Sequence, residues 1–126
     1  MDINKLNKGI ERLKKELGPS LLATDIWKSG TGTPLASFNS DPETVALFDR
    51  ATDFLKKTLE MAGFPELDDY YLLELKNHKL IVILVFPEGF QWGMLTDKEK
   101  LNMGMLLGIA IPQAKQAFYD AYQSEG

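Results

Sequence analysis

The feature that most constrains the fold is a run of seven consecutive apolar residues, LIVILVF, at positions 80–86. A strand with one face in water alternates apolar and polar side chains, so a strand that is apolar throughout is covered on both faces. Turn signals bound this run, with Asn77-His78 before it and Pro87-Glu88-Gly89 after it. Residues 68–97 therefore predict three consecutive antiparallel strands, the middle one between two layers.

Two helices are expected before these strands. The segment SDPETVALF, residues 40–48, predicts the start of the second helix, whose first turn either a Ser40–Glu43 capping box or Asp41 would cap. Gly63 and Pro65 are expected to end this helix. The first helix ends at Gly18-Pro19, and apolar residues at three- and four-residue steps predict its buried stripe: Ile3, Leu6, Ile10, Leu13 and Leu17.

A last helix is expected from about Lys98 to Tyr122, with a Thr96–Glu99 capping box. Pro112 lies inside it and predicts a kink, because proline cannot donate to the carbonyl of Gly108. Gly104 and Gly108 are interpreted as positions where the first helix or the sheet approaches closely. Nucleotide binding at these glycines is disfavoured, since they follow the expected cap and no Lys-Ser/Thr follows them.

The segments SLLATDIW, 20–27, and PLASF, 34–38, flank the glycine-containing KSGTGT as the strands of a hairpin. The predicted order is α-β-β-α-β-β-β-α. Short turns between consecutive strands favour an antiparallel sheet, and helices on both faces complete a three-layer α-β-α sandwich of the α+β class. The length fits one domain over residues 1–126.

Charge and composition exclude several classes of function. The net charge is −4 without a concentration of basic residues, so nucleic acids and anionic membranes are not expected partners. No apolar run approaches the roughly 20 residues needed to cross a bilayer. The chain has no cysteine, which excludes disulfides and thiol chemistry and fits a cytoplasmic location.

Nothing in the sequence indicates an enzyme, a metal site or a cofactor. His78 is the only histidine and lies in a predicted turn, without a second ligand or a triad partner at useful spacing. The two glycines of SGTGT lie in a loop between two strands. Because no helix dipole points at this loop, we expect a flexible hairpin tip there and not an anion site. Carboxylates in PELDD and TDKEK lie at loops and helix starts, where capping and solubility explain them.

The second helix carries more apolar surface than one sheet face usually covers. The stripe expected to pack on the sheet consists of Phe48, Ala51, Leu55, Leu59 and Ala62. A second stripe recurs at seven-residue spacing: Leu47, Phe54 and Met61. Because heptad spacing suits helix pairing, we expect this second stripe to meet the same helix of a second copy. A loop of the same chain is the alternative cover.

The strand YYLLELKN, residues 70–77, lacks the bulge or proline that protects an exposed edge. Pairing with a second copy would satisfy its free backbone groups. The residues expected to line this edge are Leu72, Glu74 and Lys76. The two charged residues could equally act as gatekeepers against aggregation.

The chain resembles the Roadblock family, the dynein-light-chain-like domains also found among bacterial and archaeal regulators of small GTPases. The resemblance rests on the order of elements, on the hairpin LLATDIWKSGTGTPLASF, and on GMLTDKEKLNMGMLLGIAIPQA at 93–114. In the family the last strand commonly ends in an acidic residue, and an Asn-x-Gly opens the final helix. Asp97, Asn102 and Gly104 occupy these positions, whereas Pro112 departs from the family pattern.

The resemblance implies a profilin-like sandwich that forms homodimers through the second helix and the third strand. It also implies a scaffold that holds or stimulates a Ras-like GTPase, without shared catalytic residues. The leading hypothesis is therefore a non-enzymatic homodimeric adaptor for a small GTPase or a related subunit. The competing hypothesis is a small-molecule sensor with a pocket between sheet and helices, which Trp27, Phe90 and Trp92 could line.

Overall fold

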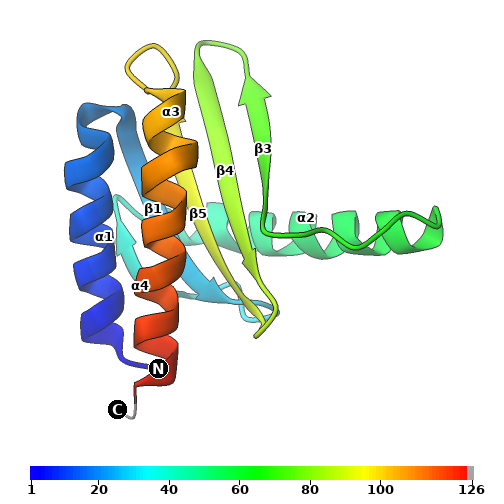
Figure 1. Cartoon of the computed structure of the whole chain (residues 1–126). Coiled ribbons are helices and arrows are strands. Elements are labelled where there is room, and N and C mark those ends of the chain that lie inside the picture. Colours follow the sequence, from blue (N-terminus) through cyan, green and yellow to red (C-terminus); the bar gives the residue numbers. More distant parts are fainter. Residues whose placement is uncertain (125–126) are drawn as a thin grey trace.

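The computed structural model describes residues 1–124 and contains one five-stranded sheet (Figure 1). All neighbouring strands are antiparallel, in the order β2-β1-β5-β4-β3. The strands are β1 (Leu21–Lys28), β2 (Pro34–Phe38), β3 (Tyr70–Leu75), β4 (Lys79–Phe86) and β5 (Phe90–Asp97). The predicted hairpin and the three consecutive strands are thus confirmed, and β3 is one edge of the sheet.

Helices lie on both faces of this sheet, which confirms the predicted α+β sandwich (Figure 1). One face carries α1 (Ile3–Leu17), followed by the short η1 (Gly18–Ser20), together with the C-terminal helical segment. That segment consists of α3 (Met103–Met105), a π-helical turn η2 (Leu106–Ala110) and α4 (Ile111–Gln123). The other face carries α2 (Pro42–Met61) alone. No helix among residues 1–124 is long and apolar enough to cross a membrane.

The two faces have cores of very different size. Between the sheet and α1 with α4 lies the main core, which includes Leu6, Ile26, Trp92 and Phe118, all completely buried. The core beneath α2 has four buried residues: Trp27, Val45, Ile83 and Val85. Strand β4 contributes alternately to both cores, as its unbroken apolar run predicts. Apolar packing therefore holds α2 less firmly than it holds the other helices.

Helix starts agree only in part with the sequence patterns. Asp41, the alternative cap, accepts from the backbone N–H groups of Glu43 and Thr44, so the Ser40–Glu43 capping box is wrong. The last helix begins at Met103 rather than near Lys98, and its cap is Asn102, which accepts from the N–H of Met105. The predicted Thr96–Glu99 box does not form, because the Thr96 hydroxyl donates to the carbonyl of Leu80 within the sheet.

Pro112 is accommodated by the π-helical turn η2 instead of an abrupt break. The N–H of Ile111 donates to the carbonyl of Leu106, five residues back, so the missing donor of Pro112 falls where the helix is already widened. Gly108 lies in this turn, and a Cβ placed on it would meet no atom within 4 Å. The expectation that Gly104 and Gly108 admit a neighbouring element is therefore wrong, since both are exposed.

The close approach occurs instead at Gly9 of α1, which leads to a stability prediction. A Cβ on Gly9 would lie 2.9 Å from the Cβ of Ala117 and 3.2 Å from the Trp92 ring. Gly9→Ala is expected to lower the free energy of unfolding by about 1–2 kcal/mol through overpacking. Gly108→Ala is the matched control and should raise it by up to about 1 kcal/mol, because alanine favours a helix. Urea unfolding of both variants measures the difference, and equal effects would contradict it.

Candidate interaction surface

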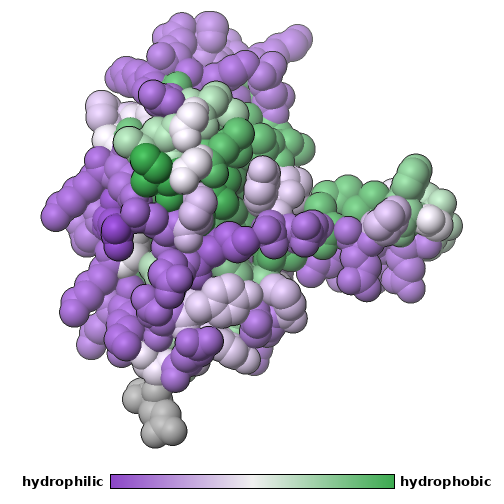
Figure 2. Space-filling view, in the orientation of Figure 1, coloured by the Kyte–Doolittle hydropathy of each residue, from purple (hydrophilic) through white to green (hydrophobic). Residues whose placement is uncertain are grey.

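The C-terminal half of α2 extends beyond the sheet. Figure 1 shows α2 crossing behind the strands and continuing past the edge strand β3, where only the segment returning to β3 runs alongside it. Figure 2 shows apolar surface along one side of this projecting half and hydrophilic surface along the opposite side. A helix that leaves its own domain with an apolar side in water is typical of an interaction surface.

Two polar side chains hold α2 on the sheet. The buried carboxylate of Asp49 accepts from Trp27 Nε1 at 3.3 Å, from Gln91 Nε2 at 3.0 Å and from the backbone N–H of Gly30 at 3.0 Å. The hydroxyl of Thr52 lies 2.6 Å from that of Tyr71 on β3. Sequence reasoning missed both residues as contacts to the sheet. Val45, Asp49 and Thr52, at i, i+4 and i+7, are the buried residues of α2.

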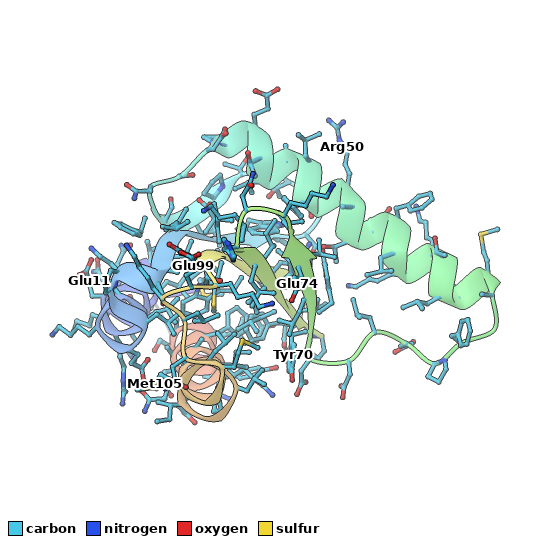
Figure 3. All side chains as sticks on the ribbon, turned by 90° about the horizontal axis from the view of Figure 1, so that it is seen from above. Glu11, Arg50, Tyr70, Glu74, Glu99 and Met105 are labelled. Atoms are coloured by element: carbon cyan, nitrogen blue, oxygen red, sulfur yellow. The ribbon has the colours of Figure 1, made fainter. Side chains whose placement is uncertain are left out.

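These buried residues fix the orientation of both apolar stripes. At about 100° per residue, Phe54 lies about 160° around the helix from Thr52, on the side away from the sheet. The stripe of Leu47, Phe54 and Met61 is 56%, 74% and 88% exposed, so no loop among the described residues covers it. We call it the outer row. Arg50, one turn from Phe54, also points away from the sheet (Figure 3).

Of the first stripe, Phe48 packs against the core beneath α2 as predicted, whereas the stripe as a whole lies on a flank of the helix. Phe48, Leu55 and Leu59 are half-buried, whereas Ala51 and Ala62 are exposed. The face of α2 toward the sheet includes the polar Asp49 and Thr52, which hydrophobic periodicity does not identify as buried. We call this stripe the flank row. It is oriented toward the part of the sheet that α2 leaves uncovered, since Phe48 borders the cleft above β1 and β5.

Strand β3 pairs with β4 along one edge only among residues 1–124. Leu72 is exposed on the side of α4, together with Tyr70 and Glu74 (Figure 3). Glu74 is ion-paired with Lys98, and the hydrogen bond from this lysine lowers the pKa of the carboxyl group. Lys76 lies in the turn after β3 and does not line the strand as predicted.

Three further exposed apolar residues were not assigned to an interface by the sequence analysis. Leu73 and Leu75 lie on the α2 side of β3, and Phe64 follows the end of α2. The backbone of Phe64 is fixed, because its N–H donates to the carbonyl of Leu59 at 2.9 Å. The strand sequence YYLLEL is apolar on both faces, and this pattern was the signal that could have identified Leu73 and Leu75 as interface residues. These residues add exposed apolar surface at the end of α2 and on the α2 side of the edge strand.

The aromatic residues proposed for a sensor pocket do not come together. Trp92 and Phe90 belong to the core under α1 and α4, where Trp92 Nε1 donates to Thr24 Oγ1 at 2.8 Å. Trp27 lies on the opposite face of the sheet, in the core under α2. That part of the expectation is wrong, because residues 90 and 92 alternate with the residues that face α2.

Three predicted signature residues have local structural roles or lie exposed. Asp97 accepts from the backbone N–H of Glu99, Asn102 caps α3, and Gly104 is exposed. His78 contacts Glu99 at 3.1 Å on the surface. Within the part of the chain that the structure describes, no three His, Asp or Glu residues are grouped as metal ligands would be.

Asp25 on β1 is a partly buried carboxyl group whose pKa leads to a prediction. Burial raises the pKa of Asp25 above its ordinary value of 3.8. Hydrogen bonds with the side chains of Ser40 and Ser37 lower the pKa in part, and the negative charge of Asp41 raises it further. The folded state therefore binds the Asp25 proton more tightly than the unfolded state, so its contribution to stability is lost as pH rises from 3.8 through the folded pKa.

Asp25→Asn should consequently stabilise the protein at pH 7 and have progressively less effect as the pH falls through the raised folded pKa toward 3.8. Thermal unfolding of the variant and the parent at pH 4, 5, 6 and 7 measures this trend. A difference in Tm that is independent of pH would contradict the assignment.

Comparisons with known proteins establish the fold. No family model matches the sequence, and no curated protein matches it either. Among solved structures, MglB from Myxococcus xanthus superimposes with a TM-score of 0.80 at 14% identity, over 96% of this chain and 97% of that one. The gliding protein MglB from Thermus thermophilus gives 0.77 at 9% identity, over 96% and 91%.

A Roadblock/LC7 domain from Streptomyces avermitilis superimposes with a TM-score of 0.69 at 15% identity, over 98% of this chain and all of that one. These matches span nearly the whole of each chain, and they agree with the order of elements, the antiparallel sheet and the three layers described above. The chain therefore has the Roadblock/LC7 fold.

Proposed function

We propose that the protein is a homodimeric adaptor that acts by binding, without catalysis, and that its partner is a small Ras-like GTPase or a related subunit. The observation that carries the proposal is the outer row of α2, which is 56–88% exposed and continues along the half of the helix that projects past β3. The fold supports it, since domains that resemble the Roadblock family serve as scaffolds and GTPase platforms.

The second copy is proposed to pair along the free edge of β3. Antiparallel pairing of two β3 strands would extend the sheet and satisfy backbone groups that are otherwise left at an edge. A two-fold axis through this junction would bring the projecting half of each α2 over the uncovered sheet face of the other copy. Leu73 and Leu75, exposed on that face, would then be buried.

The rows of α2 are proposed to have separate roles. The flank row points along the sheet, so Leu55 and Leu59 would meet the helix of the second copy. The outer row, which the sequence assigned to the dimer seam, points away from both sheets and would remain exposed in such a dimer. Leu47, Phe54 and Met61 are therefore proposed to contact the GTPase or related subunit.

The solution mass tests the dimer. Multi-angle light scattering over a tenfold concentration range should give twice 14.2 kDa throughout. A constant mass of 14.2 kDa would refute the homodimer.

The GTPase proposal is tested with purified Ras-like GTPases of the source organism, loaded with GDP or with a non-hydrolysable GTP analogue. At least one should bind in biolayer interferometry, and Phe54→Glu should weaken it by about tenfold or more, as for a residue central to an interface. Equal binding by Phe54→Glu would remove the outer row from the contact.

A further inference from the structure

Strand β3 is uncovered on the face of the sheet that carries α1 and α4. Tyr70 and Leu72 point to this face and are 39% and 36% exposed. Their partners on β4, Leu84 and Val82, are completely buried beneath the helices. The helical layer on this face therefore ends at β4, and two apolar side chains of the edge strand lie beside it in water.

The C-terminal helical segment forms a wall beside this strand. Lys115 of α4 is ion-paired at 2.7 Å with Asp69, the residue before β3, so this side of the segment faces β3. Ile111, Leu107 and Met103 precede Lys115 at four-residue steps and so lie on the same side. Ile111 is buried, whereas Leu107 and Met103 are 42% and 37% exposed. We call the space between this wall and β3 the β3 groove.

The β3 groove is apolar along its length and electrically balanced at its ends. Residues 101–114 contain no charged side chain, and Figure 2 shows apolar surface over this segment and the neighbouring strands. One end is marked by the Asp69–Lys115 pair and the other by the Glu74–Lys98 pair. Because each pair is satisfied within the chain, a charged ligand gains little here. The groove therefore fits an uncharged, apolar surface of a partner.

The width of the uncovered strip decides what kind of element can fill it. Packed helices lie about 8–10 Å apart and neighbouring strands about 4.8 Å apart, so one helix covers about two strands. On this face α1 lies toward the β2 edge, where Lys14 covers the Phe38 ring. Helix α4 lies on the central strands, where the rings of Phe118 and Phe86 stack at 3.8 Å. Two helices thus cover every strand but β3, which leaves a strip half a helix wide.

The proposed dimer would double this strip. Antiparallel pairing of two β3 strands places both β3 grooves side by side on one face, with a helical wall on each outer side. The joined trough is two strands, or about 10 Å, wide, which is the diameter of one α-helix. From Asp69 to Glu74 each strand runs about 17 Å, the length of about three helical turns.

We propose that the dimer binds one amphipathic helix of a partner protein in this trough, with the apolar stripe of that helix against Leu72 and Leu107 of both copies. The inference rests on the proposed homodimer, but it concerns the opposite face of the sheet from the outer row. The helix and the GTPase or related subunit therefore do not compete for one surface. Because the trough is one helix wide, the first helix excludes a second, and the expected ratio is one helix per two chains.

The probe is a capped peptide of about 14 residues, with leucine at every third or fourth position and Glu–Lys pairs elsewhere. Its control has the same composition, with the leucines distributed around the helix. Calorimetric titration should give one bound peptide per two chains, and ¹⁵N–¹H NMR should place it at residues 70–74 and 103–111. A protein of twice 14.2 kDa that binds no peptide would overturn the trough and leave the dimer standing. Two peptides per dimer, or equal binding of the control peptide, would also overturn it.

Leu107→Glu should weaken binding of the peptide by about tenfold or more, because it puts a charge into the apolar wall of the trough. Ile109→Glu is the matched control and should bind as the parent does. Ile109 is also 42% exposed, but it lies about half a turn further around the same segment, away from β3. Both variants should remain dimers in light scattering, since neither residue lies on β3 or on α2. Equal peptide affinities of the two variants would contradict the proposal.

Leu55→Glu, the variant expected to be monomeric, separates this proposal from that of the homodimer. A monomer has only half of the trough, so it should bind the peptide more weakly than the parent by about tenfold or more. A monomeric Leu55→Glu variant that binds the peptide as tightly as the parent would overturn the shared trough. A parent that is itself monomeric would refute the homodimer, and the trough with it.

Discussion

Leu55→Glu is expected to convert the dimer into folded monomers, whereas Phe54→Glu, at the adjacent position, should leave the dimer intact. Leu55 belongs to the flank row and is half-buried, while Phe54 is 74% exposed on the outer row. The two-fold axis would place two glutamates in one apolar seam, so the dissociation constant for Leu55→Glu should rise by about 100-fold or more. Phe54→Glu should change it by less than about threefold.

Light scattering at matched concentrations gives the masses of both variants. Far-UV circular dichroism controls for folding. Both variants should give the spectrum of the parent, because both residues lie on the half of α2 that projects past the sheet. The opposite result, a monomer for Phe54→Glu and a dimer for Leu55→Glu, would return the seam to the outer row, where the heptad spacing of the sequence placed it. Dissociation by both variants would show that the two rows form one interface.

The sheet could be predicted from sequence because its signals are local. Asn77 and His78 take positive φ values of 61° and 58° in the turn between β3 and β4, and the unbroken apolar run of β4 has helices on both sides. Gly18, with a φ of 56°, ends α1 as predicted. Each of these features depends on residues adjacent in the chain.

The orientation of α2 could not be predicted in the same way. Its apolar residues outnumber those that one sheet face can cover, so hydrophobic periodicity points to the wrong side. The side that faces the sheet is chosen by Asp49 and Thr52, whose partners Trp27, Gln91 and Tyr71 lie on β1, β5 and β3. Such hydrogen bonds depend on strands that are distant in sequence, so helix propensity does not predict them.

This polar attachment connects the stability of the domain to its interaction surface. The main core holds α1 and α4, but α2 has Val45 as the buried apolar residue of its own against two buried polar ones. The hydrogen bonds of Asp49 join α2 to β1, to the turn after β1 and to β5 at once. The direction in which the flank row and the outer row project past β3 therefore depends on this carboxylate, together with the hydrogen bond between Thr52 and Tyr71.

Asp49→Ala is accordingly expected to be the most destabilising substitution on α2. It removes the acceptor shared by Trp27 Nε1, Gly30 N–H and Gln91 Nε2, of which Gln91 still donates to Ser29, at a cost of about 3 kcal/mol or more in the free energy of unfolding. This corresponds to a fall in Tm of roughly 10 °C. Asp49→Asn, which keeps one acceptor oxygen, should have an intermediate effect.

Asp53→Ala is the matched control, one turn along the same helix. Asp53 is exposed and pairs only with Lys57 at 2.9 Å, so its removal should change the stability by less than about 1 kcal/mol. Urea unfolding of the three variants gives the values, and light scattering of Asp49→Asn reports on the dimer. If Asp49→Ala were as mild as Asp53→Ala, apolar packing and the Thr52–Tyr71 hydrogen bond would be sufficient to hold α2 on the sheet. A folded Asp49→Asn variant with a weakened dimer would instead show that this carboxylate orients the helix for its partner.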